Sequence, residues 1–211
     1  DKGLFREVIG VDLDPESRRM AVELGVVDRC EEDLAAACVG ADVIQLAVPI
    51  LAMQKLLGAL AQLPLGDAVL TDVGSAKGNV VRAAALAFDG VPPRFVPGHP
   101  IAGSEQSGVE ASNGQLFRRH KVILTPLADT DGAALQMVDR LWRELGADVE
   151  HMEVEHHDEV LAATSHLPHL LAFGLVDSLA KRSENLEIFR YAAGGFRDFT
   201  RIAGSDPVMW H

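Results

Sequence analysis

Short apolar runs alternate with segments of helical periodicity from Val8 to Met152, and this alternation constrains the fold more than any other feature of the chain. Strands are predicted at residues 8–12, 42–48, 68–73, 94–96, 122–125 and 148–152. Helices are predicted between them, at residues 14–25, 32–39, 50–63, 78–88 and 133–145. Strands that alternate with helices of about 10 to 15 residues form βαβ units, in which the strands lie parallel. We therefore expect an α/β domain built on a parallel sheet.

After Glu153 the pattern changes, because no strand-like alternation follows. Residues 155–181 are predicted to be helical, with an interruption or kink at Pro168, which lacks the N–H that a continuous helix uses. We expect the rest of the chain to be helical as well. A domain boundary near Met152 then divides the chain into an α/β domain of residues 1–152 and an all-helical domain of residues 153–211.

Composition argues against several classes of function. The formal net charge of -12 and the isoelectric point near 5.0 oppose binding to nucleic acid or to an anionic membrane, and an anionic substrate would need locally placed Arg or Lys. No apolar run approaches the roughly 20 residues of a membrane helix, and residues 1–4 do not resemble a signal peptide, so the cytoplasm is the expected compartment. Cys30 and Cys38 lack a C-x-x-C spacing and are expected to be reduced thiols.

A stiff loop at the end of a predicted strand is expected to hold His99, which lies between Gly98 and Pro100. Ligands of open α/β sheets bind outside the carboxyl ends of the strands. Glycine lets the backbone approach a ligand closely, and proline limits how far the histidine can move. His99 is therefore a candidate for binding or catalysis, and the alternative is a solvated histidine hydrogen-bonded to its own turn.

Asp12 ends the first predicted strand, where a dinucleotide-binding fold places an acid that binds the ribose 2′-hydroxyl of NAD. The G-x-G-x-x-G turn of such folds precedes that acid by about 20 residues, whereas eleven residues precede Asp12. Either the fold is a different one and Asp12 is an ordinary strand-end acid, or the given chain starts after the first strand and its phosphate-binding turn. The alternation of strands and helices favours the second interpretation.

Further polar side chains lie at predicted element ends or on an apolar stretch. Ser75 follows a strand and precedes a helix, where its hydroxyl is placed to hydrogen-bond to a bound anion or hydroxyl. The alternative is that Ser75 caps the helix. Ser165 and His169 are four residues apart and share one face if the turn is helical, on an apolar stretch where a buried polar site is expected. Arg197 and Arg201 lie among aromatic residues, and an arginine fork binds a carboxylate bidentately.

A group of histidines, His151, His156 and His157, lies among acidic residues and resembles a metal cluster. Their spacing matches no standard ligand pattern, so surface charge is the favoured interpretation and no metal is expected. The basic run at residues 118–121 is likewise interpreted as a solvated surface patch.

Four motifs follow one another along the chain: DVGSAKG at residues 72–78, GHPIAGSE at 98–105, SHLPH at 165–169 and GFRDFTRIAGSDPVMW at 195–210. In sequence and in order they resemble the motifs of the prephenate dehydrogenase family, which includes the arogenate and cyclohexadienyl dehydrogenases of tyrosine biosynthesis. The resemblance implies a Rossmann-type α/β domain, here without its first strand, followed by a helical domain that forms a homodimer. It also implies NAD-dependent oxidative decarboxylation of prephenate to 4-hydroxyphenylpyruvate, with the choice between prephenate and arogenate left open.

The resemblance also implies roles for individual residues. His99 resembles the group that takes the hydrogen bond and the proton of the ring hydroxyl, and Ser75 resembles the serine that orients that hydroxyl. Arg201 resembles the ligand of the substrate carboxylate, with Ser165 and His169 lining the same pocket. The other expected site residues are Arg197, reaching into the partner's site, Glu105 and Asp198, forming ion pairs that close the site, and Asp12, Val48, Pro49 and Ser75, binding NAD.

Two parts of the family pattern, the glycine-rich phosphate turn and the helices after the Met-Trp segment, are not among the given residues, so NAD binding by these residues alone is expected to be weak. Other readings stay open. A dehydrogenase of the 3-hydroxyacid or 6-phosphogluconate type usually relies on a lysine in the helical domain, and no lysine lies between Glu153 and Lys181. A nucleotide- or tyrosine-sensing module without turnover has no need of a base such as His99.

Overall fold

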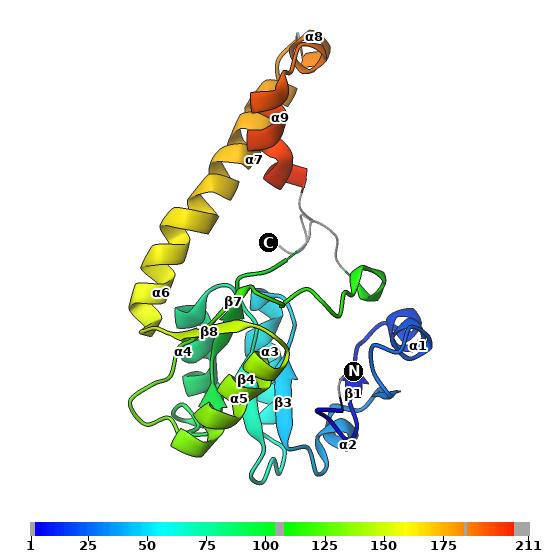
Figure 1. Cartoon of the computed structure of the whole chain (residues 1–211), viewed down its shortest axis with the longest axis vertical. Helices are drawn as coiled ribbons and strands as arrows, with labels where there is room; N and C mark the ends of the chain where they lie inside the picture. Colours follow the sequence, from blue (N-terminus) through cyan, green and yellow to red (C-terminus); the bar gives the residue numbers. More distant parts are fainter. Residues whose placement is uncertain (1–2, 104–107, 184, 205–211) are drawn as a thin grey trace. The chain divides into compact units, whose positions relative to one another are not determined.

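The computed structural model describes residues 3–103, 108–183 and 185–204 of the chain (Figure 1). The chain forms two compact units, Asp1–His157 and Asp158–His211, and each is described by itself. Within the first unit, the described strands form three small sheets, β1–β2, β3–β4–β5 and β6–β7–β8.

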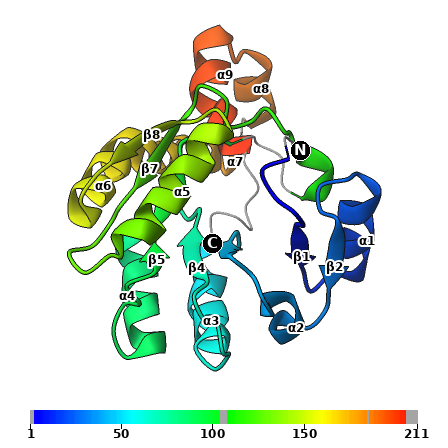
Figure 2. The ribbon, with the colours of Figure 1, turned by 60° about the horizontal axis from the view of Figure 1, so that its bottom comes forward.

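The first sheet pairs β1 (Ile9–Val11) with β2 (Arg29–Glu31) in parallel, and α1 (Pro15–Glu23) connects the two strands (Figure 2). The carboxylate of Asp14 accepts hydrogen bonds from the first backbone N–H groups of α1, which confirms the predicted helix start. The sequence does not predict β2, because its charged residues show no apolar alternation. A short helix, α2 (Leu34–Cys38), follows this strand.

The second sheet is the parallel βαβ core that the alternation predicts. It consists of β3 (Val43–Leu46), α3 (Ile50–Leu60), β4 (Val69–Asp72), α4 (Lys77–Phe88) and β5 (Phe95–Val96). The apolar faces of the helices pack on the sheet around a set of buried side chains that includes Met53, Leu57, Leu60, Val80 and Phe95. Because β4 is the central strand and is buried along its length, its carboxyl end is held firmly.

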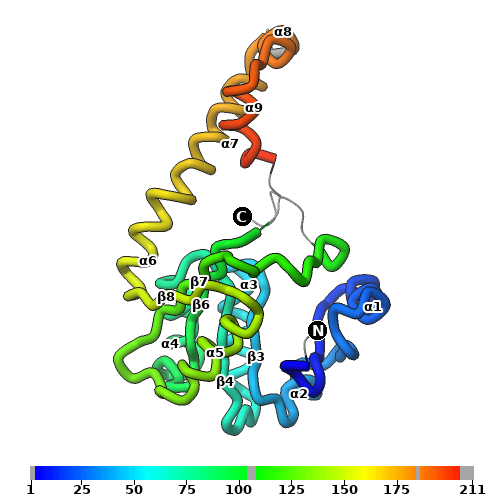
Figure 3. Tube along the Cα trace, viewed as in Figure 1, coloured from blue at the N-terminus to red at the C-terminus, as the bar shows by residue number. Residues whose placement is uncertain are grey.

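The third sheet departs from the all-parallel expectation. Its strands are β6 (Gly98–Pro100), β7 (Lys121–Leu124) and β8 (Asp148–His151), with β6 antiparallel and β8 parallel to β7. Helix α5 (Gly132–Glu144) packs against this sheet, and its Trp142 side chain is buried in a second apolar core. The short 3-10 turn η1 (Val109–Ala111), between β6 and β7 in the chain, contacts α1. Strand β6, labelled in Figure 3, begins at Gly98, and β5 ends at Val96, so Pro97 marks the change from one sheet to the next.

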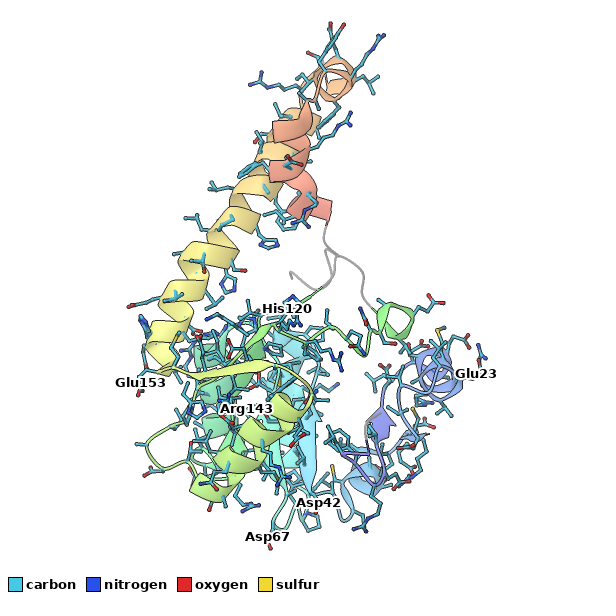
Figure 4. The ribbon with its side chains drawn as sticks, in the orientation of Figure 1. Glu23, Asp42, Asp67, His120, Arg143 and Glu153 are labelled. Carbon is cyan, nitrogen blue, oxygen red and sulfur yellow. The ribbon has the colours of Figure 1, made fainter. Side chains whose placement is uncertain are left out.

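The chain after β8 is helical in its described residues, as the sequence predicts. The elements are α6 (Val154–Leu161), the π-helical turn η2 (Ala162–His166), α7 (Leu167–Ala180), α8 (Asn185–Arg190), α9 (Gly194–Thr200) and η3 (Arg201–Gly204). Helix α6 starts after Glu153, at the turn from β8 (Figure 4). The interruption predicted at Pro168 is the π-helical turn just before this proline, which sits in the first turn of α7.

One helix of the described residues, Val154–Ala180, is long and apolar enough to cross a membrane by length and composition. The sequence predicts no such stretch, because acidic residues interrupt its first turns. A single helix of this kind is weak evidence for a membrane span. Of its most apolar window, 11% is buried.

Candidate active site

Asp72, at the end of β4, is the centre of a buried polar network. The side chains of Asp72 and Lys77 are both fully buried, and Lys77 Nζ lies 2.5 Å from Asp72 Oδ2. The carboxylate also accepts hydrogen bonds from the backbone N–H groups of Gly74 (2.8 Å) and Gly98 (3.2 Å), and Lys77 donates to the carbonyl oxygen of Gly98 at 2.6 Å. Buried charges are tolerated when they are paired and hydrogen-bonded. The network therefore ties the turn after β4 to strand β6.

Both glycines of this network lie where a side chain would be crowded by its neighbours. A Cβ atom on Gly74 would lie 2.6 Å from a side-chain carbon of α3 and 3.0 Å from the carboxylate of Asp72. A Cβ atom on Gly98 would lie 3.1 Å from the backbone oxygen of Asp72. Gly74 directly precedes Ser75 and Gly98 directly precedes His99, so the network fixes the backbone next to both residues that the family resemblance makes catalytic.

His99 lies in strand β6, opposite Ile123 of β7, and is half-buried. The expectation of a loop at this position is wrong. The chain leaves β5 at Pro97 but pairs at once with β7, and the pairing is continued by a hydrogen bond from Ile101 N–H to the carbonyl of Lys121 at 2.7 Å. A strand paired along its length holds the imidazole more firmly than proline and glycine alone.

His157 is the partner of His99 in the first unit. The Nδ1 atom of His99 lies 2.9 Å from Nε2 of His157, and the rings meet edge to face with centroids 5.1 Å apart. The interpretation of His157 as surface charge is wrong, because this residue is 0% exposed, whereas His151 and His156 are exposed as predicted. In the described part of the chain, no three His, Cys, Asp or Glu side chains form a group that could hold a metal ion.

Ser75 is exposed in the turn between β4 and α4. The alternative role as a helix cap is wrong, because the N-cap of α4 is Ala76 and no side chain caps this helix. The Ser75 hydroxyl thus stands at the carboxyl end of the central strand, beside the backbone that Asp72 holds.

The residues expected to bind NAD also follow the carboxyl ends of strands. Asp12 follows β1 and is exposed, and its Oδ1 accepts a hydrogen bond from the backbone N–H of Asp14 at 2.8 Å. Val48 and Pro49 follow β3, and Pro49 is the N-cap residue of α3. Parallel sheets bind ligands beyond these strand ends, and a carboxylate there accepts hydrogen bonds from ribose hydroxyls. The chemistry of this donor set fits a dinucleotide.

In the second unit, Ser165 and His169 lie in one helical stretch and are half-buried. Nδ1 of His169 lies 2.9 Å from the carbonyl oxygen of Ser165, so the contact runs through the backbone and not through the serine hydroxyl. Because a carbonyl can only accept, Nδ1 of His169 donates, and a neutral His169 carries its lone pair on Nε2. The π-helical turn that precedes it is a type of distortion frequent at functional sites.

The remaining predicted residues lie near the end of the described chain. Arg197 and Asp198 are exposed on α9, and Arg201 is exposed at the start of η3. Both elements contact α7 within the second unit. Glu105 lies outside the described residues. The described residues among those predicted are thus divided between the two units.

A parallel α/β unit with a strand-end carboxylate, followed by a helical unit, defines the class of this protein as a nucleotide-binding α/β protein with a helical second part. The chain belongs to the prephenate dehydrogenase family. Residues 1–151 match the model of the prephenate dehydrogenase nucleotide-binding domain, and residues 153–211 match the model of its dimerization domain. The resemblance and the fold class inferred from the sequence are thereby confirmed.

Individual relatives support this assignment. The chain is 41% identical over 197 residues to the cyclohexadienyl dehydrogenase of Zymomonas mobilis, covering 92% of this chain and 65% of that protein. It is 39% identical to the prephenate dehydrogenase of Bacillus subtilis, covering 97% of this chain and 56% of that protein. A crystal structure of prephenate dehydrogenase from A. aeolicus with hydroxyphenyl propionate and NAD+ matches with a TM-score of 0.90 and 42% identity, over 99% of this chain and 73% of that one. The chain thus spans less than two thirds of the length of these two curated relatives.

Proposed function

We propose that the full protein is an NAD-dependent prephenate dehydrogenase, which converts prephenate to 4-hydroxyphenylpyruvate and carbon dioxide. Family membership supports this, as do the relatives named prephenate and cyclohexadienyl dehydrogenase. The observation in this chain that carries the proposal is the Asp72–Lys77 network, because it fixes the backbone beside both Ser75 and His99.

The reaction needs a hydride acceptor, a proton acceptor and a site for carboxylates. NAD, when bound, supplies the hydride acceptor, and the residues proposed to hold it are Asp12, Val48, Pro49 and Ser75. His99 takes the proton of the ring hydroxyl while the ring carbon loses hydride and the carboxylate leaves as carbon dioxide. His99 then returns this proton to the phenolate oxygen, so the reaction has no net proton change. Ring aromatisation drives the reaction, and the protein mainly orients the reacting groups.

The helical part is proposed to bind the substrate carboxylates and to form a homodimer. Arg201 offers a guanidinium fork for a carboxylate, Ser165 and His169 line the same pocket, and Arg197 reaches the site of the partner subunit. Glu105 and Asp198 are proposed to form ion pairs that close the site. A second copy is the proposed cover for exposed apolar side chains of α7, namely Leu167, Leu170 and Leu171. We place the functional boundary between the two parts near Met152 and the protein in the cytoplasm.

The test is steady-state formation of NADH by the full-length protein with prephenate and, separately, with arogenate. We expect turnover with prephenate, and loss of nearly all of it in His99→Asn. The ratio of kcat/KM for the two substrates decides which one is preferred. Tight NAD binding without NADH formation from either substrate would contradict the proposal and favour the sensing module.

A further inference from the structure

His157 is buried and hydrogen-bonded to the ring that is proposed to act as the base. It lies in the first turns of α6, where its backbone N–H donates to the carbonyl of Glu153 at 2.9 Å, and its side chain is 0% exposed. The Nε2 atom of His157 lies 2.9 Å from Nδ1 of His99, a hydrogen-bond distance between the two rings. A buried imidazole in this position is not explained by helix packing alone, because burial of a polar ring is costly unless it is hydrogen-bonded.

The contact restricts where His99 carries its proton. Between two neutral imidazole nitrogens one must donate and the other must accept. If His157 donated, neutral His99 would hold its own proton on Nε2 and would have no lone pair left for a substrate. If His99 donates from Nδ1, its Nε2 carries the lone pair, and Nε2 is the atom through which His99 can accept the hydroxyl proton.

We propose that His157 is a positioning residue that accepts a hydrogen bond from Nδ1–H of His99 and so keeps the lone pair of His99 on Nε2. This inference rests on the proposed role of His99 as the base. Burial favours the neutral form of the His157 ring, which is the form that can accept. Once His99 has taken the substrate proton, its ring is positively charged, and its Nδ1–H still donates to the neutral ring of His157. Such charge-assisted hydrogen bonds are stronger than neutral ones.

The geometry of the fold explains why this position can hold a partner for His99. Strand β6 presents His99 between the buried residues Gly98 and Pro100, and α6 begins directly after β8, the other neighbour of β7. His157 therefore approaches from a helix that is anchored to the same sheet. A group that orients a catalytic histidine without touching the substrate plays the same part as the third member of a catalytic triad.

The experiment compares His157→Leu, which cannot accept a hydrogen bond, with His157→Gln, whose amide oxygen can reach about the position of Nε2. In the full-length protein we expect His157→Leu to lower kcat by roughly 10- to 100-fold, the range found when hydrogen-bond partners that orient metal-binding histidines are removed. The KM for NAD should stay nearly unchanged, and His157→Gln should recover most of kcat. His156→Leu, in the adjacent exposed position, is the matched control and should retain wild-type kcat.

A spectroscopic measurement tests the same inference without relying on turnover. In protein carrying ¹⁵N-labelled histidine, the ring nitrogens of His99 should show a protonated Nδ1 and an unprotonated Nε2 at neutral pH, and His157→Leu should shift the proton toward Nε2. If wild-type His99 is protonated on Nε2, the inference is overturned even where His157→Leu does not fold. It is also overturned if His157→Leu keeps wild-type kcat while His99→Asn is inactive. Full activity of His99→Asn would instead overturn the proposed base.

Discussion

Lys77 Nζ lies 2.5 Å from Asp72 Oδ2 with both side chains fully buried, and the same pair binds both the N–H and the C=O of Gly98. An ion pair in this position holds two segments at once, the turn that carries Ser75 and the strand that carries His99. Its main contribution is to orientation, since a buried ion pair is often no more stabilising than apolar side chains of similar volume.

Lys77→Met should destabilise the fold by about 3–5 kcal/mol, because it leaves the Asp72 carboxylate buried without its cation. Adding Asp72→Asn should restore part of this stability but not kcat, because Gly98 remains without its charged partners. Urea unfolding and steady-state rates measure the two effects. Lys181→Met is the control, since its ion pair with Asp177 is exposed and should contribute little. Equal stability of Lys77→Met and wild type would show that the pair is dispensable.

His99→Asn should lower kcat by roughly 10² to 10⁴, the usual contribution of a general base. Protonated imidazole has no acceptor, so wild-type kcat/KM should fall along an acid limb as the pH is lowered. Because His99 and His157 share a hydrogen bond, this limb belongs to the pair rather than to one ring. The limb should vanish in the residual activity of His99→Asn. Its persistence would identify another base, with His169 the next candidate.

Asp12→Asn should weaken the preference for NAD over NADP. The carboxylate follows β1 where ribose hydroxyls bind, and its charge repels a 2′-phosphate. Loss of a hydrogen bond to a charged group should raise the KM for NAD by roughly tenfold to a hundredfold. KM values for both cofactors with wild type and variant check this, and Asp28→Asn, exposed before β2, is the control. An unchanged ratio of the KM values for NAD and NADP would mean that Asp12 does not contact the ribose.

Arg201→Lys keeps the charge but loses the planar fork, so it should raise the KM for prephenate while leaving the KM for NAD nearly unchanged. Steady-state titration of each substrate at saturating levels of the other measures this separation. Arg182→Lys, an exposed substitution just after α7, is the control. Equal increases in both KM values would point to a structural role for Arg201.

Asp139 connects α5 to β8 through its contacts with Arg143 and His151. Replacing it should make the free energy of unfolding less sensitive to acid pH. The hydrogen bond from Arg143, labelled in Figure 4, and a second contact with His151 lower the pKa of the Asp139 carboxyl, although partial burial opposes them. A lowered folded-state pKa gives stability that is present above the unfolded value and lost as pH falls through the folded value. Asp139→Asn should thus cost up to about 1 kcal/mol at neutral pH.

Thermal unfolding of wild type and Asp139→Asn from pH 7 down to pH 3 measures this effect. The two curves should converge at the acid end, where the wild-type carboxyl is protonated as well. Arg140→Gln, on the same helix and 83% exposed, should follow the wild type throughout. A constant difference between Asp139→Asn and wild type at all pH values would mean that titration of Asp139 is not the cause.

The local features of the fold could be predicted from the sequence, because their causes are local. Asp14 caps α1 through N–H groups two and three residues away, and the βαβ alternation follows from apolar periodicity within single elements. The motifs around Ser75 and His99 identified the family for the same reason, since each is a short run of residues. The sequence does not predict strand β2, because two of its three residues are charged and its pairing with β1 depends on neighbours outside its own sequence.

Only the tertiary structure decided what surrounds the proposed base. A sequence presents Lys77 as an ordinary surface cation and His157 as one of several histidines among acids, since charged residues are mostly exposed. The fold buries both, because β4 and β6 bring Asp72 and Gly98 together and α6 brings His157 to His99 across 58 residues of chain. Short-range patterns determine which element forms. Contacts that exist only once the sheets and helices have packed determine which polar groups are buried and which partners they bind.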